Sequence, residues 1–396
     1  MSVHVFQPLA DIRVVEFCQI AAGPFCGMLL ADLGADVVKI ENPAGGDAMR
    51  TWPPFSEGFS ENFASLNRNK RSVALDLKTP EGRVAALDLC RQADVIVENN
   101  RPGVMDRLGL GYDRLHTFNP NLVYCSISGF GQKGPRANEG GFDVSIQAMA
   151  GVMSVTGQAN SEPVKCGVPI SDFSTGLYAA YSIATALRAV EAGSGGAFID
   201  VSLMGATLGV AALQTSEFFG TGAIPRKLGS AHPRNAPYRA FRSANGHFVM
   251  AAGNDALWAL VCQVIERPNL RTDPRFSSVS VRARNQDEML PLLEDVFVTR
   301  DSEHWLERFR AAGVPCAPIN NYQQALADPQ VEAMGWISEL DLPSGVRTRT
   351  FGNPVLFNGQ TTPIRRGPPE LGEHTDEVLT ETRKKVELEK SKAVIS

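Results

Sequence analysis

The sequence lacks an apolar run long enough to form a membrane-spanning helix. Its longest nearly uncharged stretch, around residues 203–213, contains glycines and is far shorter than the roughly 18 to 20 apolar residues that cross a bilayer. The N-terminus also lacks the basic segment and long apolar run of a secretory signal. We therefore expect a cytoplasmic protein with no membrane partner.

The sequence also lacks the residue spacings of metal sites and disulfide frameworks. Its 7 cysteines are scattered, odd in number and mostly set in apolar segments, and no Cys-x-x-Cys pair occurs, which favours buried thiols. The 6 histidines have no metal-ligand spacing. No metal ion is expected.

Motifs for phosphoryl transfer and serine hydrolysis are missing too, because neither a Gly-Lys-Ser/Thr loop nor a Gly-x-Ser-x-Gly elbow occurs. One Gly-x-Gly-x-x-Gly stands at residues 129–134, directly after an expected strand. A dinucleotide would need a helix N-terminus there to meet its pyrophosphate, but the polar, proline-containing residues 135–141 follow. The motif is therefore only a weak indication of a nicotinamide site.

What the chain does contain is a globular composition. Hydrophobic residues make up 43% and charged residues 20% of 396 residues, a length that predicts two or three domains. The 38 basic and 43 acidic side chains give a net charge of −5, which provides no general attraction to nucleic acid. An anionic ligand must therefore be held by a local group of cations.

Short β-like segments alternate with helical ones in the first third of the chain, which predicts a parallel sheet covered on both faces. The expected strands are residues 13–17, 35–41, 94–98 and 122–128, and the expected helices are 24–33, 80–92 and 112–118. A Gly- and Pro-rich loop at 129–141 and a long helix over about 173–192 should follow.

The pattern changes in the second half of the chain, which predicts a separate α+β domain. Strand-like segments at 238–242 and 247–252 are joined through Asn-Gly, a strong hairpin signal, and helices at 255–265 and 302–312 and a strand at 314–319 should follow. The expected fold class is α/β, with a large domain on a parallel Rossmann-like sheet and this smaller domain. We expect the chain to have four parts. They are the first portion of the large domain (1–200), a linker helix and connector (201–224), the small domain (225–325), and an extended return with a C-terminal helix joining the large domain (326–396).

Two groups of residues allow either a structural or a functional interpretation. Asp172 precedes the expected long helix, so it is either an N-cap or a nucleophile that the helix dipole and free amides keep ionised. The basic run at residues 68–78 is opposed locally only by Asp76, so it is either a solvated surface or a site for the phosphates of a nucleotide. Its cations are Arg68, Lys70, Arg71 and Lys78.

Six phrases follow one another over nearly the whole chain: VVEF with AGP (14–17, 22–24), LADLGADVVKIE (30–41), NKRS (69–72), LKTPEG (77–82), GFD (141–143) and LGEHTD (371–376). In order and spacing they resemble the family III CoA-transferases, to which formyl-CoA transferase and carnitine CoA-transferase belong. The resemblance implies an obligate homodimer in which each chain threads through a ring made by the other. It also implies that coenzyme A and acyl-CoA are substrates and that no cofactor is permanently bound. Asp172 would be the nucleophile, passing through aspartyl anhydride and aspartyl-CoA intermediates.

The resemblance further implies a set of residues that bind coenzyme A: Ile20 and Ala21 around the pocket, Leu75 and Lys78 at the adenine and its phosphates, and Asn99, Asn100 and Arg107 at the remainder. Asn42 stands where formyl-CoA transferase has a basic residue, so a phosphate contact there is weakened or replaced. No Gly-Gly-Gly run occurs, which indicates that the acceptor pocket differs from that for oxalate.

Two other functions stay open, a CoA-ester racemase or isomerase of the same fold and a non-catalytic CoA-binding protein. The racemases use a histidine where this chain has Phe142, which cannot move a proton. His232 and Arg234 lie either in a proline-stiffened connector or at a site for a second substrate carboxylate, because a guanidinium fork matches a carboxylate. The second interpretation, a site for a substrate carboxylate, predicts a small dicarboxylic acid as the acceptor.

Overall fold

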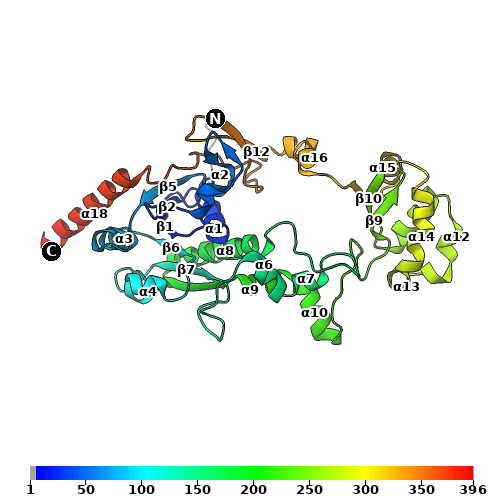
Figure 1. Ribbon diagram of the computed structural model, residues 1–396, viewed down its shortest axis with the longest axis horizontal. Coiled ribbons are helices and arrows are strands. Elements are labelled where there is room, and N and C mark those ends of the chain that lie inside the picture. Colours follow the sequence, from blue (N-terminus) through cyan, green and yellow to red (C-terminus); the bar gives the residue numbers. More distant parts are fainter. Residues whose placement is uncertain (1–5, 396) are drawn as a thin grey trace. The chain divides into compact units, whose positions relative to one another are not determined.

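The computed structural model describes residues 6–395 and divides the chain into two compact units (Figure 1). The larger unit comprises residues within Met1–Ala150, Cys166–Ser216 and Gln330–Ser396. The smaller unit comprises Gly151–Lys165 and Glu217–Pro329. The four-part domain division expected from the sequence stays a prediction.

A parallel sheet of 6 strands forms the centre of the larger unit, in the order β5-β2-β1-β6-β7-β8. The strands are β1 Arg13–Phe17, β2 Asp36–Glu41, β5 Lys70–Ala74, β6 Val95–Glu98, β7 Val123–Ser128 and β8 Ala197–Ser202. The expected parallel sheet is thereby confirmed, although β5 and β8 were not expected. The chain reverses its direction of winding between β1 and β6, which in such sheets creates a crevice at the carboxyl ends of the strands.

Apolar side chains cover both faces of this sheet, as the β-branched strands require. One face packs against α1 (Ala22–Asp32), α8 (Ile170–Glu191) and α9 (Leu203–Val210). The other face packs against α3 (Pro80–Arg91), α4 (Val104–Leu108), α5 (Tyr112–His116) and the C-terminal helix α18 (Thr375–Ile395). Helix α3 begins as its sequence predicts, with Thr79 as N-cap accepting from the Gly82 amide and Pro80 in the first turn.

The first three cations of the basic run contradict both sequence interpretations, because they are buried in ion pairs. Arg68 pairs with Asp32 at 2.6 Å, and Lys70 pairs with Glu16 at 2.9 Å. Arg71 pairs with Asp36 in β2 and with Glu377 and Glu381 in α18. Only Lys78 remains exposed. Arg68, Lys70 and Arg71 therefore join β5 and α2 to the rest of the unit and are not available to a phosphate, whereas a phosphate contact of Lys78 stays a prediction.

The smaller unit is built on the antiparallel sheet β11-β10-β9, with β9 Tyr238–Ser243, β10 Gly246–Ala251 and β11 Cys316–Pro318. The hairpin expected through Asn-Gly is confirmed as β9 and β10. Helices α11 (Asp255–Val264), α14 (Gln286–Phe297) and α15 (Ser302–Ala311) enclose an aromatic core around Phe248 and Phe297. The helices between residues 269 and 297 were not expected from the sequence.

Shorter elements complete the chain. In the larger unit they are η1 Ala48–Thr51, β3 Phe55–Ser56, β4 Phe59–Ser60, α2 Glu61–Asn67, α6 Asp143–Met149 and the hairpin β12 Ile337–Asp341 and β13 Arg347–Phe351. In the smaller unit they are α7 Val152–Val155, α12 Asn269–Thr272, η2 Pro274–Phe276, α13 Val279–Arg284 and α16 Tyr322–Leu326. Helices α10 Ala212–Thr221 and α17 Pro329–Ala333 cross from one unit to the other.

Two further expectations concerned buried thiols and the lack of a membrane-spanning helix. Burial raises the pKa of the thiols of Cys18, Cys26, Cys90, Cys125 and Cys262, which are the buried thiols expected. Over residues 6–395, no helix combines the length and the apolar composition that a membrane crossing requires.

The close packing of α1 on α8 depends on Gly176. A Cβ atom there would lie 2.7 Å from the carbonyl oxygen of Ala22 and 2.9 Å from a ring carbon of Phe25. Gly176→Ala gains about 1 kcal/mol of helix propensity, but overpacking costs about 1–3 kcal/mol, so we expect a lower urea midpoint for unfolding. In the control Gly209→Ala the Cβ atom would come within 3.0 Å only of the hydroxyl oxygen of Tyr178, the outer end of a 41% exposed side chain that can shift, so this variant should be neutral or stabilising. Equal midpoints for the two variants would contradict this account of the packing.

Candidate active site

A cleft of about 290 Å³ opens at the carboxyl ends of β1, β6 and β7, where the winding of the sheet reverses. The loop after β1, the turn after β6, the end of β7 and the start of α6 supply most of its walls, and α8 supplies Asp172. Its lining residues are Gln19, Ile20, Ala21, Ala22, Asn99, Asn100, Ile127, Ser128, Gly129, Gly141, Phe142, Asp143, Asp172 and Leu203. Among these described residues the only charged side chains are the two aspartates.

Asp172 lies inside the first turn of α8 rather than before it. The helix begins at Ile170, earlier than the sequence predicted, and its N-cap is Pro169. Asp172 is therefore the third helical residue, and the N-cap interpretation of this residue is wrong. The adjacent Phe173 contacts Phe25 of α1 edge to face, with ring centroids 4.9 Å apart. These contacts fix the helix start beside the loop that follows β1.

Asp143 is the second carboxylate of the cleft, and its own hydrogen bonds hold it in place. Its Oδ1 accepts from the Ser171 amide at 2.9 Å, and its Oδ2 accepts from the side chain of Gln147 at 2.7 Å. Gln147 in turn accepts from the Cys166 amide at 2.8 Å. Helix α6, which begins at the Asp143 of the GFD phrase, is thus hydrogen-bonded directly to α8, the helix that carries Asp172.

The electrostatics of the cleft raise the pKa of Asp172 to about 6, first through burial and then through the charge of Asp143. The sequence predicted the opposite direction, because a helix N-terminus favours an ionised carboxylate. Burial and a like charge outweigh that effect here. At neutral pH the carboxylate is still mostly ionised, and it is more basic than an ordinary aspartate, which suits a nucleophile.

Four of the predicted coenzyme A residues line the same cleft as Asp172: Ile20, Ala21, Asn99 and Asn100. Both ends of the Asn99 amide are engaged by the loop, since it accepts from the Gln19 nitrogen at 3.0 Å and donates to the Gln19 oxygen at 2.8 Å. Asn100 donates to the Phe17 carbonyl at 3.3 Å. These two amides therefore shape the cleft wall.

The other predicted coenzyme A residues lie outside this cleft. Leu75 is buried in the core on the opposite face of the sheet. Asn42, Lys78 and Arg107 are exposed, and the Asn42 side chain accepts from the Ala44 amide at 2.8 Å. Their contacts with coenzyme A stay predictions.

His232 and Arg234 both belong to the smaller unit. The Nδ1 atom of His232 accepts from the amides of Arg234 and Asn235, at 3.1 and 3.0 Å. The guanidinium of Arg234 pairs with Glu217 at 3.2 Å and is about half exposed. The sequence interpretation missed this internal carboxylate partner, which any substrate carboxylate would have to share or displace.

The glycine motif at residues 129–134 has a packing role. No helix follows it directly, since α6 begins only at Asp143. A Cβ atom on Gly129 would lie 2.9 Å from the amide nitrogen of Gly141, so two backbone segments of the cleft wall approach closely there. The motif therefore shapes the cleft without the helix that a pyrophosphate requires.

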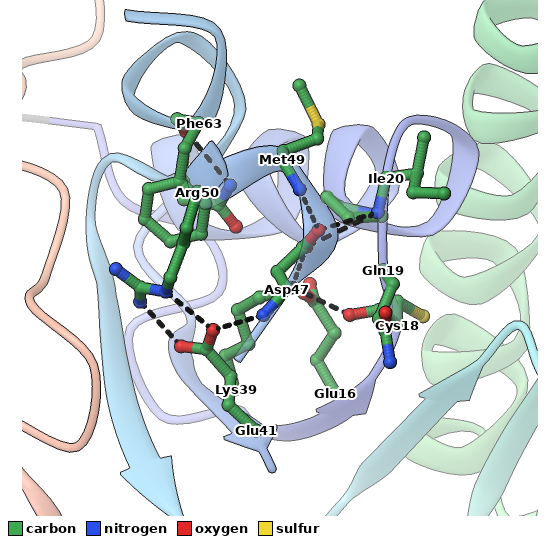
Figure 2. Close-up of polar contacts among 12 residues, drawn as sticks. Glu16, Cys18, Gln19, Ile20, Lys39, Glu41, Asp47, Met49, Arg50 and Phe63 are labelled. Carbon is green, nitrogen blue, oxygen red and sulfur yellow. Dashed lines mark hydrogen bonds and ion pairs between the residues drawn. The ribbon is translucent and has the colours of Figure 1, made fainter. Parts of the chain in front are cut away.

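Sequence reasoning missed the polar group beneath the loop that follows β1. Figure 2 shows the carboxylate of Asp47 pointing toward the amides of Ile20 and Met49, with the ammonium of Lys39 beside it. Glu16 and Lys39 are direct neighbours in the parallel ladder of β1 and β2. A charged residue within each of two apolar strands was the signal that could have revealed the pair.

Known proteins match this chain over most of its length. The model of the family described as CoA-transferase family III matches residues 9–375. The succinate–glutarate CoA-transferase of Agrobacterium fabrum is 38% identical over 383 residues, covering 94% of this chain and 95% of that protein. The acetyl-CoA:oxalate CoA-transferase of Acetobacter aceti is 39% identical over 368 residues, covering 92% and 93%.

A solved structure is similar in fold as well as in sequence. The crystal structure of a CAIB/BAIF family protein from Brucella suis has a TM-score of 0.84 and 38% sequence identity, and the match covers 95% of this chain and 99% of that one.

The raised pKa of Asp172 can be measured without any assumption about activity. We expect its carboxyl carbon, observed by NMR in protein with ¹³C-labelled aspartate and assigned through Asp172→Asn, to titrate near pH 6. Asp143→Asn keeps an acceptor for the Ser171 amide and removes the like charge, so it should lower this pKa partway toward 3.8, with burial maintaining the rest of the shift. An unchanged titration midpoint would show that Asp143 does not act on Asp172.

Proposed function

This chain belongs to CoA-transferase family III and is a CoA-transferase, and from that premise we propose that it moves coenzyme A from an acyl-CoA such as succinyl-CoA to a small dicarboxylic acid. The observation that carries the proposal is Asp172, a partly buried carboxylate with a pKa of about 6 in the cleft at the reversal of the sheet. That pKa leaves the carboxylate charged and reactive at neutral pH.

In the proposed reaction Asp172 is the covalent nucleophile. A carboxylate oxygen attacks the thioester carbonyl, forming a C–O bond and breaking the C–S bond, which leaves an aspartyl acyl anhydride and the CoA thiolate. The thiolate attacks the aspartyl carbonyl, giving an aspartyl-CoA thioester and releasing the donor acid as its carboxylate. The acceptor carboxylate then repeats the two steps in reverse, and its acyl-CoA leaves with Asp172 regenerated.

Oxyanions formed in these steps need hydrogen-bond donors, and two backbone amides at the start of α8 already have acceptors. The amide of Ile170 donates to the Val168 carbonyl, and the amide of Ser171 donates to Asp143. Each of these two donors is therefore already engaged before substrate arrives. Phe142, which lies in the cleft and is 71% exposed, provides no proton-transfer group and so disfavours the racemase alternative.

The dicarboxylic acceptor is supported by the names of the relatives, since glutarate and oxalate are both dicarboxylates. Arg234 is the candidate for the second carboxylate, with His232 beside it. In the interlocked homodimer that we also propose, the smaller unit of one chain would approach the cleft of its partner. Substrate would then replace the pairing of Arg234 with Glu217.

We expect Asp172→Ala and Asp172→Asn to abolish CoA exchange, because no other route remains once the covalent nucleophile is removed. Mass spectrometry of CoA esters, with succinyl-CoA or acetyl-CoA as donor and a panel of mono- and dicarboxylates as acceptors, is the measurement. Melting temperature and oligomeric state should match the unmodified protein. Retention of more than about 5% of the exchange rate by the alanine variant would rule out this role, since only a covalent route is proposed.

Arg234→Leu should lower kcat/KM for dicarboxylic acceptors tenfold or more, because a charged hydrogen bond contributes about 1.5 to 3 kcal/mol. The KM for the acyl-CoA donor should be unchanged. The matched control is Glu217→Gln, which frees the same guanidinium from its internal partner and should keep or raise kcat/KM for diacids. Unaltered diacid kinetics in Arg234→Leu, or equal use of butyrate and succinate by the unmodified enzyme, would contradict the role of Arg234.

A further inference from the structure

The loop between β1 and α1 forms one wall of the cleft, and a buried carboxylate holds its backbone from below. We propose that Asp47 is a positioning residue for CoA transfer, which holds Ile20 in a left-handed conformation and thereby fixes the cleft wall opposite the helix of Asp172. The inference rests on the proposed function, because its main readout is CoA exchange.

Three successive residues of the loop are each held by a side chain from elsewhere in the fold. Lys39 donates to the Cys18 carbonyl at 2.7 Å, and the Asn99 amide binds both backbone groups of Gln19. The Ile20 amide donates to Asp47, at 3.0 Å to Oδ1 and 3.3 Å to Oδ2. The backbone path of the wall is therefore set by three side chains, of which Lys39 and Asp47 lie outside the cleft lining.

Ile20 needs such support because its backbone is strained. Its φ angle is 67°, in the left-handed region that a β-branched residue rarely adopts. Strain of this kind persists only where the surroundings impose it, and it is concentrated at functional sites. The bond from the Ile20 amide to Asp47 is the contact that acts on this residue directly.

Asp47 is itself held rigidly. It is fully buried, its Oδ1 also accepts from the Met49 amide at 3.0 Å, and its own amide donates to Glu41 at 2.9 Å. Its Oδ2 lies 2.9 Å from the ammonium of Lys39. Burial acts to lower the pKa of Lys39, but the carboxylates of Glu16, Asp47 and Glu41 outweigh it and raise that pKa. Lys39 therefore stays charged and fixes the orientation of the Asp47 carboxylate.

Packing connects this group to the helix of the nucleophile. Met49, two residues after Asp47, belongs to a hydrophobic cluster with Ile20, Ala21, Phe25 and Phe173. Phe173 is the neighbour of Asp172 in α8. A displacement of the loop would therefore change both the cleft wall and the surface against which the start of α8 packs.

The test is a double-mutant comparison in which glycine removes the need for support. Asp47→Asn removes one of the two carboxylates paired with Lys39, leaving Glu16, and weakens the hold on the Ile20 amide. The kcat should therefore fall at least tenfold, with a smaller change in the KM for acyl-CoA. Ile20→Gly accepts the left-handed conformation without strain. In that background the same Asp47→Asn substitution should reduce kcat by less than about threefold, since additivity fails for residues that act on one another.

A second substitution separates geometry from charge. Asp47→Glu keeps the negative charge beside Lys39 but moves the carboxylate by one methylene group, so it should also lower kcat in the native background and less so with Ile20→Gly. The matched control is Asp32→Asn, which breaks the buried pair with Arg68 at the far end of α1. It should lower the melting temperature and leave the kcat of the folded protein unchanged, alone and with Ile20→Gly.

The positioning role would be overturned if Asp47→Asn and Asp47→Glu each lowered kcat by the same factor with and without Ile20→Gly. A loss of kcat in Asp32→Asn as large as that in Asp47→Asn would also overturn it. Absence of exchange in the unmodified enzyme with every donor and acceptor would instead refute the proposed function. Binding of acetyl-CoA by calorimetry then provides the second readout, in which Asp47→Asn must weaken affinity in the native background more than in Ile20→Gly for the inference to survive.

Discussion

The carboxylate of Glu16 binds two buried ammonium groups, Lys39 at 3.0 Å and Lys70 at 2.9 Å, and the three residues come from the adjacent strands β1, β2 and β5. Removing such charges from water is expensive, so the arrangement is stable only when each member finds its partner. A shift of one strand by a single residue would leave a charge unpaired in the core. The group therefore specifies one register for half of the sheet and fixes where the loop after β1 emerges.

The carboxylates in the cleft and beneath its loop differ in the partners that surround them. Asp47 and Asp143 each accept several hydrogen bonds and serve as fixed structural anions. Asp172 is partly buried, and no cation lies among the residues that line the cleft. Burial and the charge of Asp143 therefore raise its pKa. A reactive carboxylate and two inert ones thus differ by the partners around them rather than by residue type.

Local pattern was sufficient to predict much of the fold and part of the site. The strand expected at residues 13–17 is β1 with the same bounds, and Ile20, Ala21 and Asp172 do share one cleft. Strand β5 was missed because Arg71 resembles a surface cation until its partner Asp36, 35 positions away, is known. The direction of the pKa shift of Asp172 was wrong because burial, its main cause, and the charge of Asp143, which comes from another helix, both arise only in the folded chain.

The segment that follows β13, near the end of the sequence, packs against β5. The Asn69 amide donates to the Arg366 carbonyl, the His374 amide donates to the Ser72 carbonyl, and α18 supplies the carboxylates that pair with Arg71. During synthesis on the ribosome, β5 is made some 300 residues before these partners, a separation of 302 in the case of Ser72 and His374. Until that segment emerges, β5 is an uncovered sheet edge of the nascent chain, open to pairing with other chains.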